Sequence, residues 1–344
     1  MAEDVTCPIC AADAAVVFRN HPGYMEPDAF DIAKCDHCRT SFALLPDGYD
    51  LQPLYDTIYS QIDVVPGYSR YSTFADNVAK SAAPLVYLAE QEVTYWGIRK
   101  ALSGFTGSIL EVGTGLGYLT YALNKSGFTA TGVDISEVAV SAARARYGDY
   151  YVRNSLTQLA SAGETFDAVV MTELIEHLPD VYGVLRECDQ LLSPGGFLLI
   201  TTPNRDAWAP EVVWEVEGPP VHLWWFSESS FLAMADRLAY SAEFVDLADY
   251  PAARTWSLES VAGSPCVSRF PVLGPDGRPI SRAETSYRRW VVSTLDSVLE
   301  HAGLTAIARP PFVVRKHPAV LSSGEEHPCP TLCVKLSRSN VRVR

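Results

Sequence analysis

The chain has 344 residues, of which 48% are hydrophobic and 20% are charged, as in a soluble globular protein with room for more than one module. Its formal net charge of −14 argues against a general affinity for nucleic-acid phosphates or anionic membranes. No run approaches the roughly 18 apolar residues of a membrane span, and the acidic N-terminus lacks a signal-peptide pattern. We therefore expect a cytoplasmic protein whose cysteines serve as metal ligands or core residues.

Two C-x2-C pairs lie near the N-terminus, Cys7 with Cys10 and Cys35 with Cys38. Four thiolates at this spacing can complete a tetrahedral zinc shell. A segment of this size has too little core to fold alone, so the metal would supply its stability. The sequence therefore predicts a zinc ribbon over residues 1–45, with these four cysteines as ligands of a structural Zn²⁺.

Residues 46–102 connect the ribbon to the rest of the chain. The stretch 46–75 is rich in Tyr, Pro and Gly and predicts an ordered linker, in which Tyr68 and Tyr71 either close over a cofactor or simply pack. From about Asp76 to Leu102 the apolar spacing predicts one or two amphipathic helices, one of them begun or kinked by Pro84.

Strands and helices then alternate through residues 103–250. Apolar runs predict strands at Ser108–Val112, Thr129–Val133, Tyr150–Arg153, Asp167–Met171, Phe197–Thr201 and Glu243–Leu247, with the turn Ser193–Gly196 before the fifth. Helices are expected to begin near Leu116, Ser136, Asp180 and Ser227. This alternation predicts an α/β fold with a doubly wound, Rossmann-like sheet.

A seventh strand is predicted only at residues 331–336, within a final segment 326–344. The intervening residues 251–325 are far more than a hairpin loop needs, and Ala283–Ala302 is predicted to be a helix. We interpret this insertion as a lid over the cleft or as a contact within a homodimer.

The most informative segment runs from Ile109 to Leu119, where an apolar strand ends at Glu111 and three alternating glycines precede a helix. Gly113, Gly115 and Gly117 permit a tight turn and close approach of a ligand. The dinucleotide fingerprint G-x-G-x-x-G would need a glycine at Tyr118. A carboxylate at Glu111 repels pyrophosphate but suits an ammonium group. S-adenosylmethionine carries an ammonium and a sulfonium and no phosphate.

The other strand ends supply further candidates, because ligands of such sheets bind at the carboxyl ends of the strands. Asp134 can accept hydrogen bonds from both ribose hydroxyls, Ile135 can pack on adenine, and Ser136 caps the next helix. Asn154 offers an amide to the adenine edge. The remaining cofactor candidates at strand ends are Ser155 and Thr172.

Residues 108–205 resemble the class I S-adenosylmethionine-dependent methyltransferase family in the glycine loop, in Gly132–Ser136, in Phe166–Leu178 and in Leu191–Gly196. That resemblance implies a seven-stranded sheet whose last strand is antiparallel. The cysteine-rich leader and the pattern from His222 to Ser227 resemble bacterial members from sugar, polysaccharide and natural-product pathways. The chain departs from the family at Asn154, where the family frequently has Asp. It also departs at Arg39, where the family has glycine after the second C-x2-C pair.

Methyl transfer to an alcohol or a carbon acid requires a base near the fourth and fifth strands. His222 and His177 are the candidates, with Glu173 and Glu176 nearby. Alternatively, His222 anchors its loop, His177 satisfies the backbone of a turn, and Glu173 caps it. No set of carboxylates and histidines in the sequence indicates a catalytic metal.

These features predict a methyltransferase that acts on an oxygen or carbon of a small molecule such as a sugar, a nucleotide-sugar or a natural-product intermediate. One alternative is an RNA methyltransferase whose ribbon grips nucleic acid, but residues 1–45 hold only three basic residues, Arg19, Lys34 and Arg39. The other is a non-catalytic scaffold that binds the cofactor, and the intact glycine loop with Asp134 argues against it.

Overall fold

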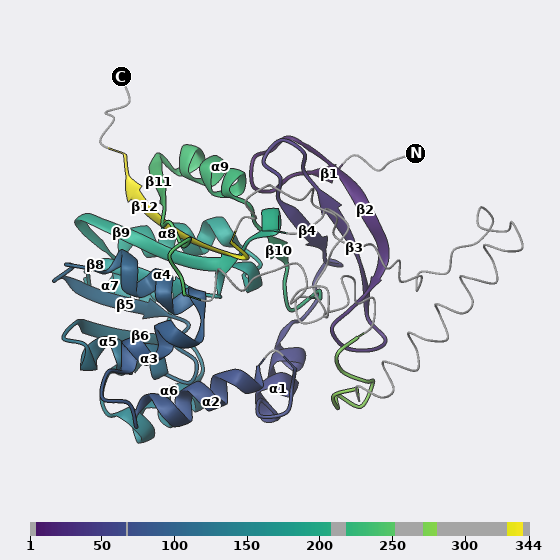
Figure 1. The fold of residues 1–344 in the computed structure, drawn as a ribbon. Helices are drawn as coiled ribbons and strands as arrows, with labels where there is room; N and C mark the ends of the chain where they lie inside the picture. The colour runs from purple at the N-terminus through teal and green to yellow at the C-terminus, as the bar shows by residue number, and fades with distance from the viewer. Residues whose placement is uncertain (1–4, 67, 208–217, 252–270, 281–328, 340–344) are drawn as a thin grey trace, which may run out of the picture.

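The computed structural model describes residues 5–66, 68–207, 218–251, 271–280 and 329–339. Its main feature is a seven-stranded sheet with the order β11-β12-β9-β8-β5-β6-β7 (Figure 1). The strands are β5 (Ser108–Val112), β6 (Thr129–Asp134), β7 (Tyr151–Arg153), β8 (Phe166–Thr172), β9 (Leu192–Pro203), β11 (Tyr240–Phe244) and β12 (Thr331–Arg338). Strands β5 to β9 are parallel, whereas β12 runs antiparallel to both β9 and β11. The predicted Rossmann-like sheet with an antiparallel last strand is confirmed.

Helices cover both faces of this sheet. One face packs against α2 (Ser69–Val78), α3 (Pro84–Gln91), α4 (Val93–Ala101), α5 (Tyr118–Lys125) and α6 (Glu137–Tyr147). The other packs against α7 (Leu156–Ser161), α8 (Val181–Gln190) and α9 (Glu228–Leu238). Because side chains alternate along a strand, Ile109 and Leu110 of β5 enter opposite cores. Burial on both faces explains the continuous apolar runs of these strands.

A second, antiparallel sheet contains β1 (Val5–Thr6), β2 (Asp13–Pro22), β3 (Ala29–Lys34) and β4 (Ser41–Leu44). Its fifth strand, β10 (Trp224–Trp225), comes from far along the chain and pairs with β4. Figure 1 shows β10 beside the N-terminal strands. The sheet that carries the cysteines is therefore completed by residues outside 1–45.

Several local predictions are confirmed. Pro84 is at the start of α3, where its missing N–H costs nothing. Ser136 caps α6 by accepting a hydrogen bond from the Ala139 amide at 3.2 Å. Asp180 and Ser227 cap α8 and α9 in the same way.

No helix among the described residues is long and apolar enough to cross a membrane.

Two local predictions were wrong, and one was incomplete. The linker 46–75 holds α1 (Gln52–Ser60) and the greater part of α2, helices that the sequence analysis did not predict there. The sixth strand is Tyr240–Phe244 rather than Glu243–Leu247, because Ala239 adopts a left-handed conformation that ends α9 and leads directly into the strand. The Ser193–Gly196 turn is an irregularity inside β9, opposite a register shift in β8. The predicted helix Ala283–Ala302 lies outside the described residues.

Candidate active site

The glycine loop occupies the carboxyl end of β5 and has the backbone that only glycine adopts readily. Gly113, Gly115 and Gly117 have φ values of +71°, +50° and +80°. A Cβ at Gly113 would lie 2.9 Å from Leu174, and one at Gly117 would lie 2.6 Å from the Ala143 Cβ. At Gly115 only a backbone atom at 4.0 Å would be near it. Gly113 and Gly117 thus let Leu174 and Ala143 pack against the loop. Gly115 leaves its side of the loop open to a ligand.

Asp134 ends β6 beside this loop. Its Oδ2 accepts a hydrogen bond from the Gly115 amide at 3.0 Å, and its Oδ1 accepts one from the Ser136 amide at 2.9 Å. Each carboxylate oxygen keeps a further lone pair, so a pair of ribose hydroxyls can still donate to it. The carboxylate is therefore held in a fixed orientation at the edge where the sequence predicts the ribose.

Glu111 is buried at the base of the loop, only 5% exposed. Its Oε2 accepts hydrogen bonds from the hydroxyls of Thr120 and Thr114. Burial raises the pKa of Glu111 to about 7, although both threonines oppose the shift. A cation placed against the loop would stabilise the carboxylate form, as the predicted ammonium contact requires.

The remaining cofactor candidates differ in what their side chains do. Ile135 is 74% exposed, so its side chain is accessible to a ring placed beside Asp134. Ser155 is engaged as the cap of α7, in a reciprocal capping box with Gln158. The Thr172 hydroxyl is buried and has no hydrogen-bond partner among the described residues. Asn154 is partly buried after β7.

A chain of aromatic rings from α1, α2 with its N-cap residue, and the start of α5 connects the glycine loop to the histidines. The rings contact in the order Tyr118, Tyr71, Tyr68, Tyr59, Tyr55, with centroids 6.0–6.5 Å apart. Tyr55 continues the series to His177 at 6.3 Å. The tyrosine rings therefore form a continuous row from Tyr118, the residue after the glycine loop, to His177. Their spacing of three or four residues was the signal for helices that our linker prediction missed.

His177 and His222 lie together although they come from separate segments. Their rings meet edge to face with centroids 4.7 Å apart. His177 ends the short helix η1 (Ile175–His177), and its Nδ1 lies 2.5 Å from the Val221 carbonyl. A carbonyl only accepts, so Nδ1 carries the proton and Nε2 keeps a lone pair. His177 thus anchors the loop that carries His222.

Glu176, which the sequence places near the candidate histidines without a role of its own, joins this pair. It is 1% exposed, and its Oε2 accepts a hydrogen bond from the Thr202 hydroxyl at 2.9 Å. Its Oε1 lies 3.8 Å from His177 Nε2. One donor atom from each of Glu176, His177 and His222 lies within 4.8 Å of the others, close enough to share an acceptor hydroxyl or a divalent cation. The sequence named these three residues as neighbours but did not indicate a set of possible metal ligands, because the two histidines are far apart in the chain.

Both imidazoles are neutral at physiological pH. Burial lowers the pKa of His177 to about 4. Burial and the neighbouring His177 lower the pKa of His222 well below its ordinary value. The Nδ1 atom of His222 is buried without a hydrogen-bond partner among the described residues. A neutral ring with an unused nitrogen can accept a proton from a molecule bound beside it.

Glu173 lies within a group of charged side chains that includes Glu92 and Arg70. Its Oε1 accepts a hydrogen bond from the Thr94 hydroxyl at 3.3 Å, and its backbone has a φ of +49°. Burial and the charge of Glu92 raise the pKa of Glu173 to about 7, against the effect of Arg70. Arg70 itself forms an ion pair with Glu92 at 2.6 Å. Glu173 therefore interacts with side chains of the α2–α4 region, and one of them, Arg70, also lowers the pKa of His222.

The four N-terminal cysteines converge as predicted. Their sulfur atoms all lie within 4.8 Å of one another, with Cys7 to Cys38 at 3.6 Å and Cys10 to Cys35 at 3.5 Å. Tetrahedral zinc with Zn–S bonds near 2.3 Å places its sulfurs about 3.8 Å apart. Hydrogen bonds from the Cys7 thiol and the Thr40 hydroxyl lower the pKa of the Cys38 thiol, which favours the thiolate a metal needs. The cluster fits a tetrahedral metal.

Comparison with known proteins agrees with this geometry. Residues 85–240 match the family model described as a methyltransferase domain. Ubiquinone biosynthesis O-methyltransferase of Xanthomonas campestris pv. campestris is 35% identical over 128 residues, which are 36% of this chain and 53% of that protein. The Parvibaculum lavamentivorans protein of the same name is 34% identical over 128 residues, 35% of this chain and 51% of its own.

The chain spans about half the length of these curated relatives. Among solved structures, the plantazolicin methyltransferase BpumL in complex with SAH is 16% identical, with a TM-score of 0.41 over 83% of this chain and 94% of that one. The matched residues contain the glycine loop, Asp134, the histidines and α9. Residues 85–240 of this chain therefore form a methyltransferase domain.

Proposed function

We propose that this protein transfers the methyl group of S-adenosylmethionine to an oxygen or carbon of a small molecule. The observation that carries the proposal is the arrangement at the carboxyl edge of the sheet. A cofactor cradle with two carboxylates, Glu111 and Asp134, is joined by a row of tyrosines to a buried, neutral histidine pair. The ubiquinone biosynthesis O-methyltransferase relatives support oxygen as the acceptor atom.

When bound, S-adenosylmethionine supplies an electrophilic methyl group on a sulfonium whose departure leaves a neutral thioether. The residues of this chain must then bind the two reactants in line and take the acceptor's proton. Gly115 and Asp134 hold the cofactor side. On the acceptor side, His222 accepts the proton, and the carboxylate of Glu176 stabilises the positive charge that reaches the histidine pair.

We further propose that the four cysteines hold a structural zinc ion and that the ribbon does not bind nucleic acid. Each basic side chain within residues 1–45 is in an ion pair with a carboxylate. The pairs are Arg19–Asp31 at 3.0 Å, Lys34–Asp36 at 2.9 Å and Arg39–Asp206 at 2.7 Å. A ribbon whose cations are already paired offers little attraction to phosphates, so a small-molecule acceptor is favoured over RNA. A cytoplasmic location and a homodimer remain part of this proposal.

Two measurements test the proposed function. A calorimetric titration should show binding of S-adenosylmethionine, and its absence would end the proposal. The protein is then incubated with methyl-labelled cofactor and separate pools of nucleotide-sugars, phenols and ribosomal RNA. Label in a small molecule supports the proposal, label in RNA supports the alternative, and binding without any transfer supports a scaffold.

The role of the histidines can be separated from that of a metal at the same place. After treatment with a chelator that leaves the ribbon zinc in place, transfer should persist if His222 acts as the base. Loss of transfer that an added divalent cation restores would instead show that Glu176, His177 and His222 act as metal ligands.

A further inference from the structure

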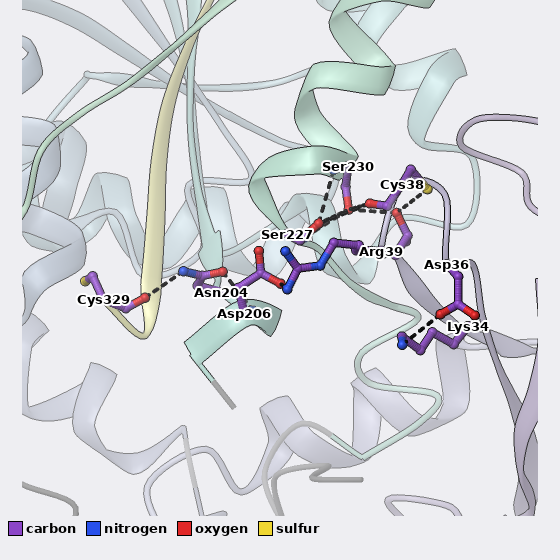
Figure 2. Close-up of polar contacts among 10 residues, drawn as sticks. Lys34, Asp36, Cys38, Arg39, Asn204, Asp206, Ser227, Ser230 and Cys329 are labelled. Atoms are coloured by element: carbon purple, nitrogen blue, oxygen red, sulfur yellow. Dashed lines mark hydrogen bonds and ion pairs between the residues drawn. The ribbon is translucent and has the colours of Figure 1, made fainter. Parts of the chain in front are cut away.

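The second C-x2-C pair, Cys35 with Cys38, forms a knuckle that contacts the segment carrying His222. The Cys38 carbonyl accepts hydrogen bonds from the Ser227 hydroxyl at 3.1 Å and the Ser230 hydroxyl at 3.2 Å. Thr40 lies between the knuckle and α9. Its Oγ1 is 2.7 Å from the Ser230 Oγ and 3.1 Å from the Cys38 Sγ. All three hydroxyl-bearing residues are completely buried. Figure 2 shows these contacts between the ribbon and the N-terminus of α9.

The backbone next to His222 is held from two sides. The Leu223 carbonyl accepts a hydrogen bond from the Ala43 amide of the ribbon at 2.9 Å. The Leu223 amide donates to the Glu176 carbonyl at 2.8 Å, on the side of the histidine pair. Beyond it, β10 pairs with β4 through Trp224 opposite Phe42. A single residue thus connects the ribbon sheet to the turn that carries Glu176 and His177.

Arg39 adds a third attachment at the point where the chain departs from its family. It has a φ of +61°, a conformation that favours glycine. Its guanidinium forms an ion pair with Asp206 at 2.7 Å, in the short helix η2 (Arg205–Ala207) that follows β9. Asp206 in turn donates its amide to the Asn204 side chain, which donates to the Cys329 carbonyl (Figure 2). A strained knuckle residue therefore supplies a contact that glycine could not.

We propose that Arg39, Thr40 and Ser230 are positioning residues for methyl transfer, through which the zinc-bearing knuckle holds His222 against the acceptor. This inference rests on the proposed function. With zinc on the four cysteines, the Cys38 thiolate can only accept, so Thr40 donates to it instead of to Ser230. Ser230 then turns its single proton from the Cys38 carbonyl to the Thr40 oxygen, and Ser227 keeps the hydrogen bond to that carbonyl. The knuckle and the His222 segment then form one rigid unit, while no ribbon residue takes part in the contacts of Glu111 and Asp134 described above.

The test compares Thr40→Val, which removes the hydroxyl at nearly constant volume, with Thr40→Ser, which keeps it. Arg39→Gly removes the ion pair and fits the backbone, so it should fold at least as well as the native protein. Arg19→Ala is the matched control, because its ion pair with Asp31 stays within the ribbon. Zinc content, affinity for S-adenosylmethionine, kcat and acceptor KM are measured for each variant.

We expect Thr40→Val and Arg39→Gly to keep zinc and cofactor affinity while kcat falls about tenfold or more, since a small misplacement of a catalytic group is costly. Thr40→Ser and Arg19→Ala should stay within about twofold of the native kcat. The inference is overturned if kcat is unchanged in both test variants, or if it falls only together with zinc content or cofactor affinity.

Hydrogen–deuterium exchange tests the same attachment without any turnover. Amides of residues 218–227 should exchange faster in Thr40→Val and Arg39→Gly, while those of residues 108–117 stay unchanged. Equal exchange of residues 218–227 in all variants would refute the inference. If the native protein transfers no methyl group to any acceptor, the proposed function fails, and the exchange result still decides whether the knuckle holds this segment.

Discussion

The two halves of the candidate site are built in different ways. The cofactor half consists of residues that follow one another closely along β5, β6 and the turns after them. Gly115 contacts Asp134, and Glu111 contacts Thr114 and Thr120. The acceptor half joins η1, the loop before β10, and the ribbon, which lie far apart in the sequence. In the function that we propose, local motifs therefore form the cofactor half, whereas long-range packing forms the acceptor half.

The two halves also differ in the interactions that stabilise them. The glycine loop is supported by its own backbone and by the parallel sheet behind it. The His222 segment depends on β10, which has two residues and obtains its partners from the ribbon. Such a short strand is stable only while its neighbours are in place. Damage to the ribbon should therefore impair the acceptor half more than the cofactor half.

The largest effect should come from loss of the metal. Cys7→Ser should abolish zinc binding and lower the free energy of unfolding of the ribbon by about 4 kcal/mol or more, because removal of a structural metal is among the few changes that cost this much. Elemental analysis and thermal unfolding measure both effects. Cys329→Ser, outside the cluster, is the control. A Cys7→Ser protein that stays folded and keeps its full complement of zinc would refute the ribbon.

The second largest effect should be the loss of kcat on substitution of His222, the proposed general base. His222→Gln should lower kcat by about 10²- to 10⁴-fold, the usual contribution of a general base, while cofactor affinity stays the same. Single-turnover rates and calorimetry separate the two quantities. His177→Gln is the comparison variant, since His177 donates to the Val221 carbonyl and Gln can also donate. If kcat of His222→Gln stayed within about threefold of the native value, His222 would only anchor its loop.

The sequence predicted the sheet, the backbone of the glycine loop and the helix caps well because all three depend on local rules. Apolar runs of the right length, glycines with positive φ and the caps at Ser136, Asp180 and Ser227 are encoded within a few residues. The sixth strand was misplaced because the left-handed residue that ends α9 is an alanine. Only glycine or asparagine would have marked that position in the sequence.

The acceptor half could be predicted only in part. The two histidines were found as candidates, but their contact with each other, with Glu176 and with the ribbon comes from tertiary pairing. The tyrosines of the linker were noticed as a composition, although they lie on helices whose ring contacts extend to His177. Burial and desolvation, which keep both imidazoles neutral, depend on the complete fold and have no sequence pattern.

The third prediction addresses the cofactor half alone. Asp134→Ala should weaken binding of S-adenosylmethionine at least about 100-fold, because it removes two charge-assisted hydrogen bonds of about 1.5–3 kcal/mol each. The substitution also frees the Gly115 amide that holds the loop. Asp134→Asn, which keeps the shape and one acceptor oxygen, should lose less. Calorimetry measures all three proteins, and native-like affinity in Asp134→Ala would exclude the ribose contact.

The smallest expected effect tests whether Glu111 contacts the ammonium group of the cofactor. Its pKa is about 7 in the free protein, and an adjacent cation favours the ionised carboxylate. Below pH 7 the ligand must displace a proton, so affinity should fall by up to about tenfold for each pH unit below 7 and level off above it. The same raised pKa means that Glu111 destabilises the free protein as pH rises from 4.5 to 7.

The measurement uses S-adenosylhomocysteine, which keeps the ammonium group and lacks the reactive methyl, titrated between pH 5.5 and 8. Glu173 also has a pKa of about 7, so it is the other group that could produce such a profile. In Glu173→Gln the pH dependence should persist, and in Glu111→Gln it should disappear. The reverse result would show that Glu173, and not Glu111, contacts the ammonium group. Glu173 would then belong to the cofactor half of the site.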